Sequence, residues 1–128
     1  MTENSGMAVA WTRRLTIVNL GLASLQPISA GFLLSGYDHA AMIHAAGAAA
    51  LLAGAFSQAV TAVVSWLRRG VSGRVAALSV WLLAMVVLEA WAGRHREYWL
   101  HVPVGVGVVV WLGARINRPL SGSSSIRQ

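Results

Sequence analysis

Two histidines, His44 and His101, lie inside apolar stretches that are long enough to cross a membrane. An imidazole without a hydrogen-bonding partner is costly to bury in hydrocarbon, so intramembrane histidines usually have a specific role. His44 is near the beginning of the second apolar stretch, and His101 is near the beginning of the fourth. Two imidazoles at a similar depth on two helices are suited to hold a haem iron between them. We therefore predict that both are axial ligands of one haem b, with satisfied structural histidines as the alternative.

Glycines accompany both histidines at helical spacing. Gly47 follows His44 by three residues and Gly105 follows His101 by four, so each glycine shares a helix face with its histidine. A porphyrin edge needs a helix surface without side chains beside the ligand, and glycine supplies such a surface. The alternative is that these glycines allow close contact between helices, which is their common use in membranes.

Further polar residues are candidates for contacts with the cofactor. Glu89 is a carboxyl group inside a predicted span. We expect its side chain either to accept a hydrogen bond from Nδ1 of a ligating histidine or to be a protonated, neutral acid. The alternative is that the side chain extends to the outer membrane interface. Gln26 is expected to hydrogen-bond across the core. His39, Arg94 and Arg96 fall in the outer turns, where haem propionates would emerge, although solvated loop residues are the simpler interpretation of each.

The composition indicates an integral membrane protein. Hydrophobic residues make up 56% of the chain and charged residues 11%, with a mean hydropathy of +0.61. The chain has no cysteine, which excludes disulfides, thiolate ligation of haem, covalent c-type attachment and cysteine-ligated iron–sulfur clusters. A zinc site would need further ligands, and the helical spacings His-x-x-x-His and Glu-x-x-His are missing.

Four apolar runs must position these residues. At a rise of about 1.5 Å per residue, each approaches the roughly 30 Å of a bilayer core as a helix. The connections between them are short, so consecutive helices must be antiparallel neighbours. We predict an all-α, up-down-up-down four-helix transmembrane bundle, in which the second and fourth helices are diagonal neighbours. The runs are 15–35, 40–66, 75–93 and 98–114.

The arginines predict the orientation in the membrane. Eight of the ten lie before the first run, between the second and third runs or after the fourth, and two lie in the outer turns. By the positive-inside rule both termini are cytoplasmic, in the plasma membrane of a bacterial cell. We divide the chain into a cytoplasmic segment 1–14, a transmembrane domain 15–115 and a flexible cytoplasmic tail 116–128. Within the first segment, residues 1–12 should be loosely ordered. The net charge of +6 then requires no nucleic-acid partner.

The residues around the two histidines resemble one four-helix half of the haem A synthase family and small four-span bacterial membrane proteins of the same layout. In that family each half carries one histidine on its second helix and one on its fourth, so the resemblance implies haem binding by His44 and His101. The Glu-x-x-x-His-Arg pattern of the family is missing here. Ala40 stands where the pattern has glutamate, four residues before His44, and Ala45 stands where it has arginine. The synthase reaction is therefore not implied. The matching segments are 25–31, 43–46, 88–93 and 100–103.

The sequence thus predicts a small membrane b-type cytochrome with its haem near the extracytoplasmic face. Two histidine ligands leave no open position on the iron, so the role is electron transfer or haem handling, rather than an enzyme's chemistry. Partners would be membrane lipid and a quinone or a redox protein, and a homo-oligomer is compatible with the pattern. Two other functions stay open: a small proton-coupled transporter that uses Glu89, and a noncatalytic accessory subunit of a membrane complex.

Overall fold

The computed structural model describes residues 2–116, and this part of the chain contains four helices and no strand. The helices are α1 (Thr2–Leu34), α2 (Ala40–Leu67), α3 (Gly73–Arg94) and α4 (Tyr98–Ile116). All four are long and apolar enough to cross a membrane. The predicted all-α membrane bundle is therefore confirmed, and the chain is a multi-pass membrane protein.

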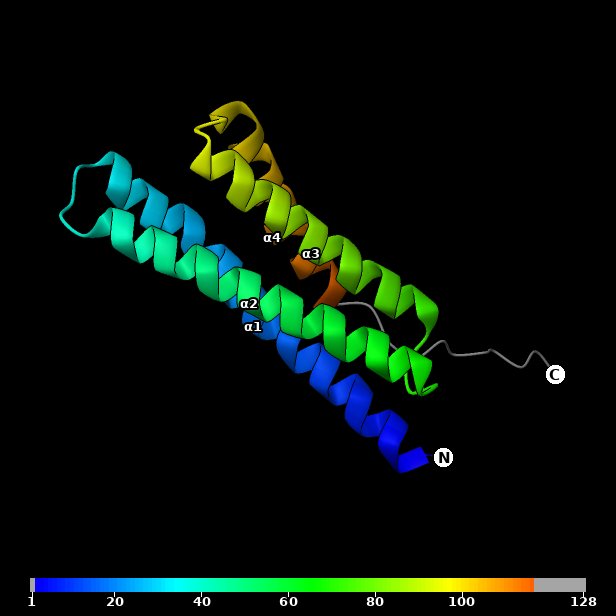
Figure 1. Cartoon of the computed structure of the whole chain (residues 1–128). Coiled ribbons are helices and arrows are strands. Elements are labelled where there is room, and N and C mark those ends of the chain that lie inside the picture. Colours follow the sequence, from blue (N-terminus) through cyan, green and yellow to red (C-terminus); the bar gives the residue numbers. More distant parts are fainter. Residues whose placement is uncertain (1, 117–128) are drawn as a thin grey trace.

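The helices form two hairpins that lie side by side (Figure 1). Each helix packs against the next one in the chain, and α1 also packs against α4, whereas α2 and α4 occupy opposite corners. This is the predicted up-down-up-down order. We call the end with the α1–α2 and α3–α4 turns the hairpin end, and the end with the α2–α3 turn the terminal end.

Helix α1 begins far earlier than the apolar run from residue 15. Its start at Thr2 contradicts the expectation that the first twelve residues are loosely ordered. Tertiary contact explains the difference, because Ala8 lies against Gly70 in the α2–α3 turn. Thr12 is completely buried and bonds its hydroxyl to the Ala8 carbonyl at 2.9 Å. The predicted flexible tail lies outside the described residues, except for Ile116.

Polar side chains follow the face of α1 that points into the bundle. They are spaced three, four or seven residues apart, which places them in one stripe of a helix. Lipid does not hydrogen-bond, so such groups are favoured inside a membrane bundle, where they join helices. The Asn19 amide, for example, donates to the Gln58 side chain of α2 at 2.8 Å. The buried polar residues of α1 are Thr12, Thr16, Asn19, Gln26 and Ser29.

Two amides of this stripe pack on two glycines of α2. Asn19 lies against Gly54 and Gln26 lies against Gly47, so the pairs are separated by seven residues along both helices. A side chain at either glycine would collide with the amide opposite. These contacts fix the rotation of α1 against α2, and this rotation sets where Ser29 and His44 meet.

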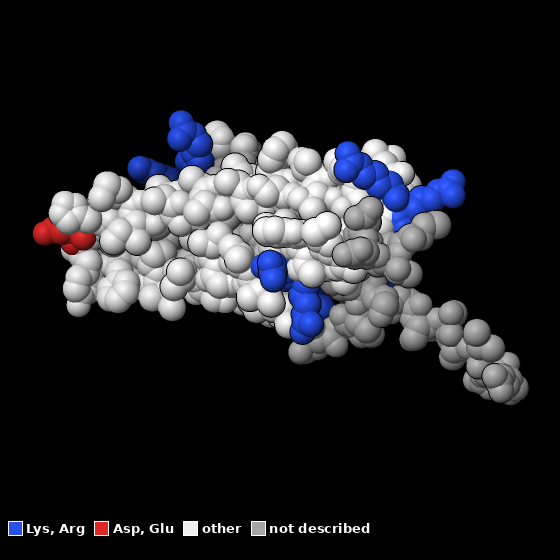
Figure 2. Space-filling view, turned by 90° about the horizontal axis from the view of Figure 1, so that it is seen from below, with Lys and Arg blue, Asp and Glu red and all other residues white. Residues whose placement is uncertain are grey.

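The outer surface of the bundle is apolar, as lipid contact requires. Large hydrophobic side chains are exposed along every helix, including Leu25, Phe56, Trp81 and Val106. On the face that Figure 2 shows, the basic side chains form separate groups, the visible acidic side chains lie at one end, and a broad uncharged surface covers the rest. The apolar core inside is built from Leu51, Leu82, Val86, Val108 and Leu112, with Ala23 and Ala55.

Candidate functional site

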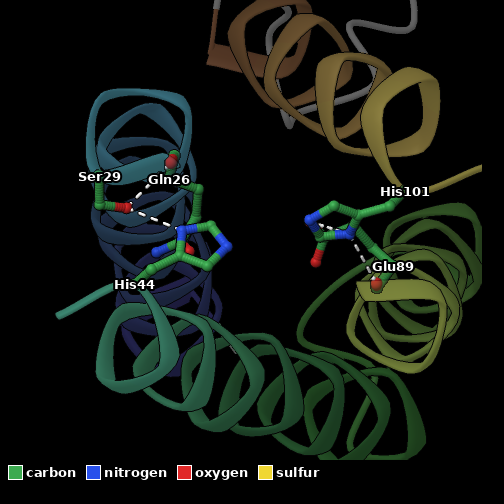
Figure 3. Close-up of polar contacts among 5 residues, drawn as sticks. All are labelled: Gln26, Ser29, His44, Glu89 and His101. Atoms are coloured by element: carbon green, nitrogen blue, oxygen red, sulfur yellow. Dashed lines mark hydrogen bonds and ion pairs between the residues drawn. The ribbon is translucent and has the colours of Figure 1, made fainter. Parts of the chain in front are cut away.

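The two histidines meet inside the bundle near the hairpin end. The ring of His44 on α2 and the ring of His101 on α4 have their centres 6.2 Å apart, with an angle of 83° between their planes. Because α2 and α4 are diagonal neighbours, the rings span the interior (Figure 3). Each ring turns one nitrogen towards its own hairpin and the other towards the opposite ring.

Ser29 holds the Nδ1 side of the His44 ring by a hydrogen bond. Its hydroxyl donates its single hydrogen to the Gln26 carbonyl at 2.9 Å. The same oxygen lies 2.9 Å from Nδ1 of His44, and with its hydrogen already used it can only accept there. With the Ser29 hydrogen on the Gln26 carbonyl, Nδ1 of His44 is the donor in this bond, and Nε2 lies on the side that faces His101.

Glu89 performs the same function for His101. Nδ1 of His101 lies 3.0 Å from the Glu89 backbone carbonyl and 3.2 Å from its carboxylate Oε1. A carbonyl oxygen only accepts, so Nδ1 is again the donor. The Glu89 side chain is 11% exposed, which places this carboxylate inside the bundle and not at the interface. The Glu89 side chain thus lies beside His101 and does not extend to the membrane interface.

Gly47 and Gly105 have different surroundings. Gly47 is covered by Gln26, whose amide donates to the His44 carbonyl at 3.2 Å and accepts from the Ala48 N–H at 3.3 Å, in the orientation that satisfies both neighbours. Gly47 thus serves close helix contact and presents no bare surface to the histidines, which corrects the expected porphyrin cradle there. Gly105 lines the cavity described below, beside the Glu89 carboxylate.

Sequence reasoning missed two residues of the site, Ser29 and Gly93. A Cβ atom on Gly93 would stand 2.8 Å from Cε1 of His101, so the absence of a side chain lets the imidazole lie close against α3. Ser29 could have been found from its place on the polar stripe, one turn after Gln26. The only sequence signal for Gly93 is its position four residues after Glu89, on the same helix face. This signal is weak, because the chain has thirteen glycines.

A cavity of about 380 Å³ adjoins the two histidines. Its volume is within the range of small-molecule sites, about 300–1,000 Å³. Gln26, His44, Glu89 and His101 contribute the polar groups, and apolar residues of α1 and α4 form most of the wall. The cavity therefore combines a few convergent polar atoms with an apolar lining, as cofactor sites do.

The residues expected to bind propionates lie at the hairpin end but outside the cavity lining. His39, Arg94 and Arg96 are all exposed. His39 and Arg96 also adopt left-handed backbone conformations, with φ of 64° and 60°. Within the turn after α3, the Arg96 N–H donates to the Gly93 carbonyl at 3.2 Å. Their backbones thus shape the two turns, while the structure brings none of the three side chains to the histidines.

Over residues 2–116, no three side chains among His, Asp and Glu form a group that could hold a metal ion. Comparisons with protein-family models, curated proteins and solved structures find no match to this chain.

Proposed function

We propose that this protein is a small b-type cytochrome that holds one haem b between His44 and His101. One observation carries the proposal: the imidazoles of His44 and His101, each held at Nδ1 by its own hairpin, turn Nε2 towards each other inside a membrane bundle, where neutral rings would present two lone pairs. Two facing acceptors without a donor between them are unfavourable. A metal ion between them converts both lone pairs into bonds.

The separation of the rings supports this assignment. A metal–nitrogen bond to imidazole is about 2 Å long, so two rings on opposite sides of one metal have centres about 6 Å apart. The observed distance is 6.2 Å. Ligating histidines also typically donate their second N–H to a carbonyl, carboxylate or other oxygen, as His44 and His101 do with Ser29 and Glu89.

The protein's residues determine what the site can do. His44 and His101 would hold the haem iron, while Ser29 and Glu89 fix the orientation of the two rings. A haem with two histidine ligands supplies one-electron transfer and has no open position for oxygen or substrate. The proposed role is therefore electron transfer or haem handling in the membrane and not catalysis of a bond-making reaction.

The arginine distribution supports a location in the bacterial plasma membrane with both termini cytoplasmic. The hairpin end would then face the extracytoplasmic side, and the haem would lie close to that side. Electrons could reach or leave it through a lipid-soluble quinone or a redox protein that docks at the hairpin end. Membrane lipid covers the remaining apolar surface.

The proposal is tested by the absorption spectrum of the purified protein after expression with added haem precursor. We expect a Soret band, and on reduction the sharp α band of a low-spin haem with two nitrogen ligands. Pyridine extraction should identify haem b at one per chain. A protein that is folded by circular dichroism but has no Soret band would contradict the proposal.

Ser29→Ala should weaken haem binding without removing it. The variant loses the acceptor for Nδ1–H of His44 and keeps both iron ligands, and losses of such supporting hydrogen bonds cost about 10–100-fold in affinity. Haem titration of the apoprotein in detergent measures the effect. Ser35→Ala is the matched control, because the exposed Ser35 hydroxyl, just after the end of α1, donates to the Gly31 carbonyl at 2.9 Å and does not contact the histidines. Equal affinities in the two variants would exclude a role for Ser29.

A further inference from the structure

The cavity beside the histidines opens sideways, through the gap between α1 and α4. We infer that the site takes its haem directly from the lipid phase through this gap, and that Gly31 sets the width of the opening. The inference rests on the proposed haem site. It adds the route, the phase from which the cofactor comes and a residue that controls entry.

The cavity wall is formed mainly by residues of α1 and α4. On α1 the lining residues Pro27, Gly31 and Leu34 are exposed on the outer surface of the bundle. On α4 the lining residues Val102 and Val106 are likewise exposed, each by more than half of its surface. Residues that both line a cavity and reach the surface mark its opening. We call this opening the α1–α4 mouth.

Two of the four polar groups that line the cavity come from the helices opposite the α1–α4 mouth. His44 on α2 and Glu89 on α3 are supplied by the two helices that form its floor, together with Leu51 and Val86. Leu51 is 4% exposed and Val86 1% exposed, so the floor is closed towards the far side of the bundle. A ligand that enters through the α1–α4 mouth therefore passes an apolar rim before it meets the histidines.

The chemistry of the rim favours a ligand that arrives through the bilayer. The exposed rim residues are all apolar and belong to helices that can span the membrane. The charged residues of the hairpin end, Asp38, Arg94, Arg96 and Glu97, do not line the cavity. Haem has an apolar macrocycle that partitions into lipid, and this rim would not exclude it. Entry from water past the two turns is the alternative outcome of the test below.

Gly31 is the residue whose size matters most at the α1–α4 mouth. A Cβ atom added there would meet nothing within 4 Å, so the position faces open space at the rim. A large side chain fits at this position without disturbing the packing of α1, and it would project into the opening. Gly21, also on α1, likewise has open space around it but does not line the cavity, which makes it a matched control.

The experiment compares Gly31→Trp with Gly21→Trp as apoproteins in lipid nanodiscs. Haem is added to the bilayer, and the growth of the Soret band is followed in time. We expect uptake by Gly31→Trp to be about tenfold slower than by wild type, because binding then requires α1 and α4 to separate, while the final spectrum is unchanged. Gly21→Trp should take up haem at the wild-type rate.

A second pair tests the opposite rim. Val106→Trp on α4 should slow uptake as Gly31→Trp does, whereas Val87→Trp, on an exposed position of α3 outside the cavity lining, should not. Equal rates in wild type and both rim variants would overturn the lateral route and leave the haem site intact. A wild-type protein that develops no Soret band would overturn the haem site itself, and the route with it.

Discussion

Replacing His101 by alanine should abolish the low-spin haem spectrum completely. The variant removes one of the two Nε2 lone pairs that converge on the cavity, and among the residues that line it only His44 offers a second imidazole. The remaining single ligand would leave a five-coordinate, high-spin haem with a broadened Soret band, or no haem at all. His44→Ala should have the same effect, because the two rings are equivalent in this respect.

Two controls separate ligation from misfolding. His39→Ala and His95→Ala remove exposed imidazoles at the hairpin end and should leave the spectrum unchanged. Imidazole added to His101→Ala should restore the low-spin bands, since the cavity has room for the free ligand at the vacated position. A low-spin spectrum that survives in both alanine variants would show that the ligands are other residues.

Gly93→Val should produce the second largest loss, although Gly93 carries no functional group. A Cβ atom at this position would stand 2.8 Å from Cε1 and 3.0 Å from Nδ1 of His101, so the ring must move. Displacement of the ring breaks its contact with the Glu89 carbonyl and shifts Nε2 away from His44. We expect haem affinity to fall by about 100-fold, at the upper end of what loss of a ligand's supporting contacts costs.

The measurement for Gly93→Val is haem titration, with circular dichroism as the check on folding. Gly107→Val is the matched control, because a Cβ atom at Gly107 would meet nothing within 4 Å and Gly107 lies outside the histidine cavity. Both variants place a β-branched residue in a helix, so they share any cost to helix formation. Equal haem affinities of the two variants would show that the close contact of the His101 ring with Gly93 of α3 is not needed for haem binding.

These two predictions also differ in how they could have been found. The role of His101 is predicted from the sequence, because histidine is rare in apolar spans and its chemistry is evident. The role of Gly93 required the structure. Glycines are frequent in membrane helices, and only the path of α4 past α3 shows which of them faces the imidazole.

The sequence by itself determined the four spans, their antiparallel order and the common depth of His44 and His101. The thickness of the hydrocarbon core sets the helix lengths, and short connections leave one arrangement of neighbours. The tertiary structure decided how each helix is rotated about its axis. In a membrane bundle both the lipid side and the core side are apolar, so hydrophobic periodicity defines this rotation poorly. Specific contacts define it instead, such as Gln26 on Gly47 and Ser29 on His44, and these place the two Nε2 atoms face to face.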